Sequence, residues 1–198
     1  MNIDQDPTNN MAQLTRDISL CRFCEDNLEP RPVVRLGSNA RLLIIGQAPG
    51  TKVHTSGIPW HDASGKRLRE WLALSEAQFY DTEMIAIMPM GFCYPGKGQR
   101  GDLPPRPECQ QRWHARILSE LANVRLTLLI GQYAQRAYLS DAFQSLTDNV
   151  RAWQQWLPEF IPLPHPSPRN QLWLKQRPWF EKTLVPEMRE IVHRLLFS

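Results

Sequence analysis

The chain has 198 residues, of which 42% are apolar and 22% charged, and its formal net charge is +3. This composition is typical of a folded globular domain and excludes a chain that is disordered through most of its length. No apolar run approaches the roughly 20 residues of a membrane-spanning helix, and the polar, acidic start lacks the features of a secretory signal. We therefore expect a cytoplasmic, monomeric protein with no membrane partner, whose mild positive charge permits nucleic-acid binding without requiring it.

The predicted elements alternate between strands and helices. Residues 1–12 are expected to form a flexible tail, and a short helical pattern follows within residues 13–28. Short apolar runs predict buried parallel strands at 41–46, 84–88, 126–131 and, more weakly because of its prolines, 160–163. Helical periodicity fills the intervals, at 65–74, 107–121, 132–139, 150–156 and 179–197. This order predicts a single α/β domain over residues 1–198, a three-layer α/β/α architecture with a central four-stranded parallel sheet.

Two loops that follow predicted strands are candidates for the functional site, because ligands of open α/β sheets bind at the carboxyl ends of the strands. One loop reads Gly46-Gln47-Ala48-Pro49-Gly50, and the other reads Pro164-His165-Pro166-Ser167-Pro168-Arg169-Asn170. Loops rich in Gly and Pro can present backbone N–H groups to a phosphate or a small polar ring. Each motif alone is also consistent with an ordinary turn, and His165 alone with a structural histidine.

The four cysteines are candidates for a metal site, since disulfides are rare in the cytoplasm. Cys21 and Cys24 form a C-x2-C motif, and Cys93 and Cys109 are separated by 15 residues in a proline-rich stretch. A set of four thiolates can bind an iron–sulfur cluster or a zinc ion. The absence of any metal is the third alternative.

The two loops together, in this order and about 115 residues apart, resemble the signature motifs of the uracil-DNA glycosylase superfamily. The resemblance extends from about Cys21 to the C-terminus. The cysteine arrangement is similar to that of the iron–sulfur families of bacteria and archaea, usually numbered 4 and 5. That similarity implies a structural [4Fe-4S] cluster on Cys21, Cys24, Cys93 and Cys109.

The resemblance implies a DNA glycosylase that hydrolyses the N-glycosidic bond of uracil, or a related deaminated base, in DNA during base excision repair. His165 would donate a hydrogen bond to the leaving base, and Trp60 would stack on the flipped base. The remaining base-binding residues would be Gly46, Ala48, Pro49 and Gly50. Ser167, Arg169 and Asn170 would contact DNA, and Lys97, Arg100 and Arg106 would form a basic rim.

The sequence departs from the resemblance at the catalytic carboxylate. Gln47 replaces the Glu of family 4; an amide is no general base but can orient a water molecule. Ala48 stands where family 1 carries its catalytic Asp. Asp62 lies in a segment similar to the one that supplies an Asp in family 5, so we predict Asp62 as the carboxylate, with His61 as a secondary candidate. The alternative role for Asp62 is the N-cap of the following helix.

A second departure concerns the choice of base. The Asn that reads uracil in family 4 has no counterpart within residues 87–91, so the base preference stays open. A non-catalytic nucleic-acid-binding protein on the same fold is the alternative function, and a hydrolase of free nucleosides is a third.

Overall fold

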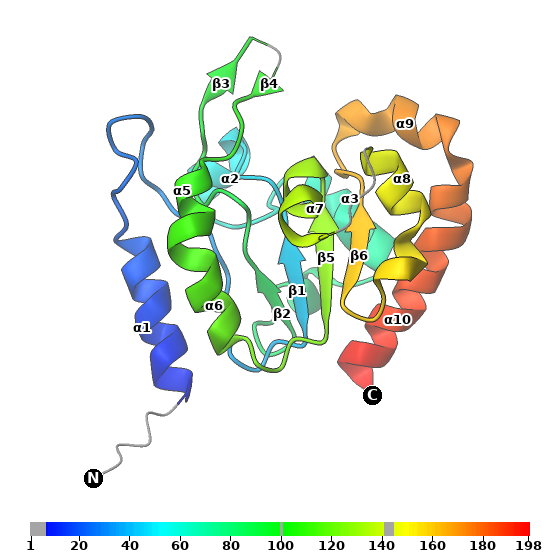
Figure 1. Cartoon of the computed structure of the whole chain (residues 1–198), viewed down its shortest axis with the longest axis horizontal. Coiled ribbons are helices and arrows are strands. Elements are labelled where there is room, and N and C mark those ends of the chain that lie inside the picture. Colours follow the sequence, from blue (N-terminus) through cyan, green and yellow to red (C-terminus); the bar gives the residue numbers. More distant parts are fainter. Residues whose placement is uncertain (1–6, 100, 141–144) are drawn as a thin grey trace.

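A sheet of four parallel strands forms the centre of the computed structural model, which describes residues 7–99, 101–140 and 145–198 (Figure 1). The strands are β1 (Leu42–Ile45), β2 (Ile85–Ile87), β5 (Leu126–Ile130) and β6 (Phe160–Leu163), in the order β2-β1-β5-β6. Nearly all of their side chains are buried. Apolar residues in every position are typical of a parallel strand covered on both faces, and the predicted four-stranded parallel sheet is confirmed.

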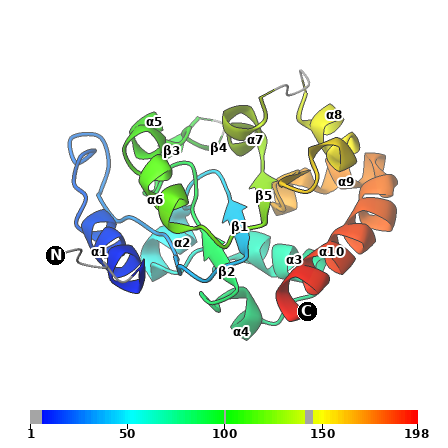
Figure 2. The same ribbon diagram turned by 60° about the horizontal axis from the view of Figure 1, so that its bottom comes forward.

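Helices cover both faces of the sheet, which completes the predicted three-layer architecture (Figure 2). Alternate residues of β1 point to opposite sides, so that Leu42 and Ile44 belong to one apolar core and Leu43 and Ile45 to the other. The first core is covered by α3 (Ala63–Leu72), α8 (Leu146–Arg151), α9 (Gln171–Gln176) and α10 (Val185–Phe197). The second is covered by α1 (Pro7–Ser19), α6 (Ala115–Glu120) and α7 (Gln132–Tyr138).

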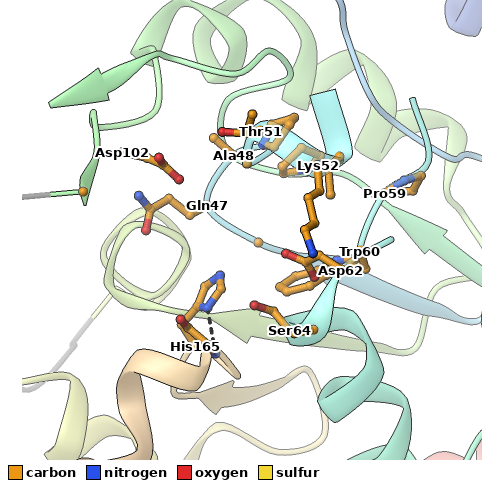
Figure 3. A pocket seen from close by; sticks show the side chains of 18 of the residues that line it. Gln47, Ala48, Thr51, Lys52, Pro59, Trp60, Asp62, Ser64, Asp102 and His165 are labelled. Carbon is orange, nitrogen blue, oxygen red and sulfur yellow. Dashed lines mark hydrogen bonds between the residues drawn. The ribbon is translucent and has the colours of Figure 1, made fainter. Parts of the chain in front are cut away.

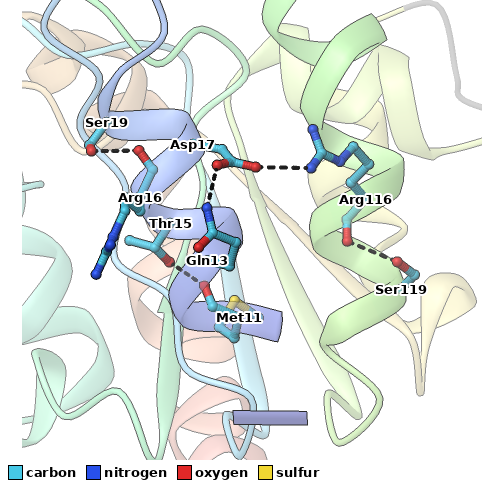
Figure 4. A network of polar contacts seen from close by, with 8 residues as sticks. All are labelled: Met11, Gln13, Thr15, Arg16, Asp17, Ser19, Arg116 and Ser119. Atoms are coloured by element: carbon cyan, nitrogen blue, oxygen red, sulfur yellow. Dashed lines mark hydrogen bonds and ion pairs between the residues drawn. The ribbon is translucent and has the colours of Figure 1, made fainter. Parts of the chain in front are cut away.

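The N-terminal helix α1 corrects one prediction. Residues 7–12, which we expected in a flexible tail, belong to α1, while residues 1–6 lie outside the described part of the chain. Met11, Leu14 and Ile18 are buried in the same core as residues of α6. Figure 4 shows the polar edge of this contact, where Asp17 accepts a hydrogen bond from Gln13 Nε2 (2.7 Å) and pairs with Arg116 of α6 (3.4 Å).

Two predicted helices contain wider turns. The stretch predicted as a helix at 107–121 begins with α5 (Pro107–Cys109), continues as a π-helical turn (Gln110–His114) and ends as α6. The C-terminal stretch likewise has a π-helical turn (Phe180–Leu184) before α10. Pro186 lies in the first turn of α10, a position that tolerates its missing N–H group. The stretch predicted at 150–156 consists of the end of α8 and a 3₁₀ turn (Trp153–Trp156).

Several short elements were not predicted. They are α2 (Thr51–Ser56), α4 (Glu76–Phe79), α9, and an antiparallel hairpin of β3 (Lys97–Gly98) and β4 (Gly101–Asp102). The hairpin projects beyond the carboxyl ends of the central strands in Figure 1, and Arg100 within it lies outside the described residues. Within the described ranges, no helix combines the length and the apolar character needed to cross a membrane.

Candidate active site at the carboxyl edge of the sheet

A pocket of about 630 Å³ lies where β1 and β6 end (Figure 3). All of the predicted catalytic, base-binding and DNA-binding residues line it: Gly46, Gln47, Ala48, Pro49, Gly50, Trp60, Asp62, His165, Ser167, Arg169 and Asn170. The two motifs are far apart in the sequence and meet because β1 and β6 both flank β5 in the same parallel sheet. The structure therefore brings the predicted residues together, while their individual roles stay predictions.

The 46–50 loop is fixed by backbone hydrogen bonds to the segment that follows β2. Met90 N donates to Gly46 O (2.8 Å), and Gly91 N donates to Gln47 O (3.0 Å). A Cβ atom at Gly46 would lie 2.8 Å from the indole of Trp60, closer than side chains pack. Glycine at this position therefore allows the Trp60 ring to lie directly against the loop.

Trp60 is held in a backbone conformation that is uncommon for residues other than glycine, with φ at +58°. Its carbonyl accepts a hydrogen bond from Arg69 Nη1 (3.3 Å), and the preceding Pro59 carbonyl accepts one from Tyr80 Oη (2.7 Å). A Cβ atom at Gly65 would lie 1.7 Å from Trp60 O, so α3 can approach this segment only with glycine there. These contacts fix the indole as one wall of the pocket.

His165 faces this wall, with 5.6 Å between the imidazole and indole centroids. Its Nδ1 accepts a hydrogen bond from Ser167 N (3.2 Å), so in the neutral ring the proton is on Nε2, which is left as a donor. Burial lowers the pKa of His165, and the nearby carboxylates of Asp62 and Asp102 offset part of that shift. A pKa below the usual 6.5 keeps the ring neutral at pH 7.

The loop that carries His165 is held from two sides. Asn170 Nδ2 donates to His165 O (2.7 Å), and Arg67 Nη1 of α3 donates to Ser167 O (3.4 Å). Ser167 Oγ accepts from Arg169 N (3.2 Å). Asn170 and Ser167, which we predicted as DNA contacts, therefore also shape the loop, whereas the side chain of Arg169 is exposed.

Asp62 occupies the N-cap of α3, where its Oδ1 accepts a hydrogen bond from Gly65 N (2.8 Å). The capping role that the sequence left open is thus present. The same carboxylate lines the pocket and raises the pKa of His165, so its negative charge also acts within the site. His61, the secondary candidate, is exposed and is not among the residues that line the pocket.

Sequence reasoning missed several residues of the pocket. Thr51 and Lys52 begin α2 directly after the 46–50 loop, Ser64 lies buried in the first turn of α3, and Asp102 comes from β4. Arg106, which we predicted in a basic rim of this site, instead pairs with Glu108 and interacts with Cys24. Arg106 is not among the residues that line the pocket, and its predicted contact with DNA stays a prediction.

The four cysteines lie outside the pocket as free thiols. Burial raises the pKa of Cys93 to about 11, with smaller contributions from Cys21 and Cys24, and that of Cys109 to about 12, with contributions from the other three. The thiols are therefore within electrostatic reach of one another, although they come from three separate segments. Within the described ranges, no three His, Cys, Asp or Glu side chains are arranged to hold a metal ion.

The model of the uracil DNA glycosylase superfamily matches residues 34–189, which is well over half of the chain. The matched span includes both pocket loops, Trp60 and Asp62, and it also includes Cys93 and Cys109. Cys21 and Cys24 precede it.

Proposed function

Because the chain belongs to the uracil DNA glycosylase superfamily, we propose that it is a DNA glycosylase that releases uracil, or a related deaminated base, from DNA in base excision repair. One observation carries this proposal most directly. A neutral histidine presents its Nε2–H group beside an aromatic wall, in a pocket at the carboxyl edge of the sheet.

The aromatic wall suits a base that has left the DNA stack. A glycosylase must extrude its target nucleotide to reach the glycosidic bond, and the exposed base then needs a new stacking partner. The Trp60 indole offers such a surface, and stacking on an aromatic side chain contributes about 1–3 kcal/mol per base. The pocket volume of about 630 Å³ is within the range of sites for small ligands.

His165 stabilises the departing base. When the glycosidic bond breaks, its electron pair leaves with the base, and negative charge develops on the base oxygens. The Nε2–H group of a neutral imidazole donates a hydrogen bond to that charge from a position fixed by Ser167 N. Donors that are oriented in advance for a developing anion are worth about 2.7–4 kcal/mol each.

The sugar acquires the opposite charge. Hydrolysis of a glycosidic bond passes through an oxocarbenium-like state that carboxylates stabilise. Asp62 supplies negative charge from the N-terminus of α3, and Gln47 can orient a water molecule through its amide. Arg169 and Lys52 line the pocket and are exposed. Their positive charges are suited to bind phosphates of the DNA backbone.

We also propose that Cys21, Cys24, Cys93 and Cys109 bind a [4Fe-4S] cluster with a structural role. Four half-buried thiols that influence one another's pKa fit the thiolate chemistry of such clusters. A single tetrahedral zinc ion needs sulfurs about 3.8 Å apart, as a Zn–S distance of about 2.3 Å implies. Within the described ranges no three His, Cys, Asp or Glu side chains are arranged to hold a metal ion, and for this reason we favour the cluster over zinc.

The test is a panel of oligonucleotides that contain uracil, hypoxanthine, xanthine or no lesion, incubated with purified protein and then treated with alkali to cleave abasic sites. We expect cleavage at one or more deaminated bases and none in unmodified DNA. Salt-dependent DNA binding without release of any base would overturn the proposal in favour of a non-catalytic DNA-binding protein. Release of base from free nucleosides alone would overturn it in favour of a nucleoside hydrolase.

A further inference from the structure

The β3–β4 hairpin brings a second carboxylate to the pocket. Asp102, the last residue of β4, lines the pocket together with the 46–50 loop. Its Oδ2 atom lies 3.8 Å from the position that a Cβ atom would take at Gly50. The carboxylate therefore occupies space directly above the loop that follows β1. In the view of Figure 3, Asp102 and Gln47 lie on one side of the pocket and Trp60 and Asp62 on the other.

Contacts within the hairpin hold Asp102 in this position. Tyr94 Oη donates a hydrogen bond to Asp102 Oδ1 (3.4 Å), and Lys97 is its cross-strand partner in the β3–β4 register. Leu103 N donates to Gly96 O (2.9 Å) and closes the base of the hairpin. The Oδ2 atom lies on the side of Gly50 and the pocket.

The two acidic residues of the pocket differ in what else they do. Asp62 holds the first turn of α3 through the hydrogen bond from Gly65 N to its Oδ1. Asp102 is exposed and caps no helix. Both carboxylates are close enough to His165 to raise the pKa of its ring, so they act on the same space from opposite sides.

We propose that Asp102 is the carboxylate that activates the attacking water molecule. This inference rests on the proposed glycosylase function. The 46–50 loop offers only the amide of Gln47 and the methyl group of Ala48 at this edge of the sheet, and neither accepts a proton. The β3–β4 hairpin supplies the carboxylate that the 46–50 loop lacks. Asp62 lies on the opposite side of the pocket, where its negative charge stabilises the positive charge that develops on the sugar.

The chemistry balances as a hydrolysis. The water oxygen forms a bond to the anomeric carbon of the sugar, and the glycosidic C–N bond breaks with its electron pair going to the base. Asp102 accepts one proton from the water, while His165 Nε2–H stabilises the base anion. The base takes a proton when it leaves, and Asp102 returns its proton to solvent.

The experiment is single-turnover base release by Asp102→Asn on the oligonucleotide that the wild-type protein cleaves fastest. Loss of a general base slows chemistry by about 10²–10⁴-fold, so we expect a decrease of at least about a hundredfold. Asp102→Glu should retain more activity than Asp102→Asn. Formate added to Asp102→Ala should restore part of the rate, because a small carboxylate can occupy the space that the truncated side chain leaves.

The matched control is Glu76→Gln, which neutralises an exposed carboxylate in α4, away from the pocket. It should keep the wild-type rate. A wild-type protein that releases no base from any lesion contradicts the proposed function itself. An active wild-type protein with an Asp102→Asn rate within about threefold of its own overturns the present inference alone. A variant that changes which base is released fastest, without a loss of rate on that base, also overturns it, since Asp102 would then read the base.

Discussion

The pocket and the cysteine site, which comprises Cys21, Cys24, Cys93 and Cys109, are held in place in different ways. The pocket stands on the ends of buried strands. Gly131 N and Gln135 Nε2 both donate to Leu163 O, two residues before His165, at 2.9 and 3.0 Å. The cysteines lie in a turn after α1, in the loop after β2 and in α5, where Phe92 N donates to Cys109 Sγ at 3.4 Å.

The difference shows that the folded chain alone orders the pocket, whereas the cysteine site depends on a bound group. The sheet, the helix caps and the tightly packed glycines fix the pocket before any ligand binds, so that little reorganisation is needed during the reaction. The cysteine site joins segments that are distant in the sequence through half-buried thiols. A bound group there would restrain those segments, and its binding free energy would contribute to folding. Substitutions at the two sites therefore separate a loss of catalysis from a loss of folding stability.

The largest effect on the rate of base release should follow from His165→Ala. This variant removes the hydrogen-bond donor and leaves the rest of the pocket in place. We expect single-turnover base release to slow by about 10²–10³-fold, the usual cost of losing one oriented donor to a developing anion. DNA affinity should change little, because phosphate contacts supply most of it. The control is His61→Ala, which removes an exposed histidine that does not line the pocket and should keep nearly the full rate. Equal losses in both variants would show that the loss is not specific to His165.

The next largest effect should follow from Cys93→Ser. This variant removes a ligand of the cysteine site and leaves the residues of the pocket unchanged. Purified wild-type protein should contain iron and absorb visible light, as thiolate-bound clusters do, and the variant should lose both properties. The free energy of unfolding should fall by about 4 kcal/mol, because the long loop between Cys24 and Cys93 is no longer closed. Wild-type protein stripped of iron is the matched control and should unfold like the variant. If iron-free wild-type protein kept its full stability, this result would contradict the cluster. It would also contradict the view that the cysteine site, unlike the pocket, needs a bound group to restrain its segments.

A buried histidine that does not line the pocket predicts how the free energy of unfolding depends on pH. His114 is 3% exposed, its Nε2 donates to Pro89 O (3.2 Å), and its Nδ1 accepts from Tyr138 Oη (2.6 Å). Burial lowers its pKa to about 4. The unfolded chain takes up this proton near pH 6.5, so the free energy of unfolding should fall as the pH decreases from 6.5 to 4. The loss should reach about 3 kcal/mol, at about 1.4 kcal/mol per pH unit.

Urea unfolding of wild-type protein and His114→Gln at pH 7 and pH 4.5 measures this contribution. The glutamine can still donate to Pro89 O but does not titrate, so the variant should lose less stability on acidification. His61→Gln, which changes an exposed histidine, should behave like the wild-type protein. An identical pH dependence in wild-type protein and His114→Gln would show that the imidazole is not kept neutral by the fold.

The sheet and the pocket motifs were predictable because their signals are local. Each strand is a short apolar run, and each motif directly follows a strand, so their meeting at one edge follows from parallel topology. The helix over residues 7–12 was also visible in principle. Met11, Leu14 and Ile18 have helical spacing, but the polar residues around them suggested a tail. Their burial depends on contact with α6, which lies about 100 residues away.

Asp102 and Arg106 show where the sequence could not decide. The strands of the hairpin have two residues each and consist of Lys, Gly and Asp, so they carry no periodic pattern. Asp102 is held by Tyr94 from outside the hairpin strands and lies near Gly50, which several helices and strands separate from it in the sequence. Arg106 looks like any other charge of the proline-rich stretch, and only the fold places it beside Glu108 and not at the pocket.

The smallest effect should follow from Asn170→Ala, which tests the pocket at its edge. The side chain donates a hydrogen bond to His165 O (2.7 Å), and such a bond contributes about 1 kcal/mol. If its main role is to position the His165 loop, kcat should fall about fivefold, while the KM for DNA stays unchanged.

The matched variant is Arg67→Ala, which removes the other hydrogen bond to this loop, at Ser167 O. The double variant should lose more than the sum of the two single effects, because the loop then has neither bond. If Asn170 contacts DNA instead, as we predicted from the sequence, the KM should rise with kcat preserved. Whether the substitution changes kcat or KM therefore decides whether Asn170 positions the His165 loop for catalysis or contributes to DNA binding.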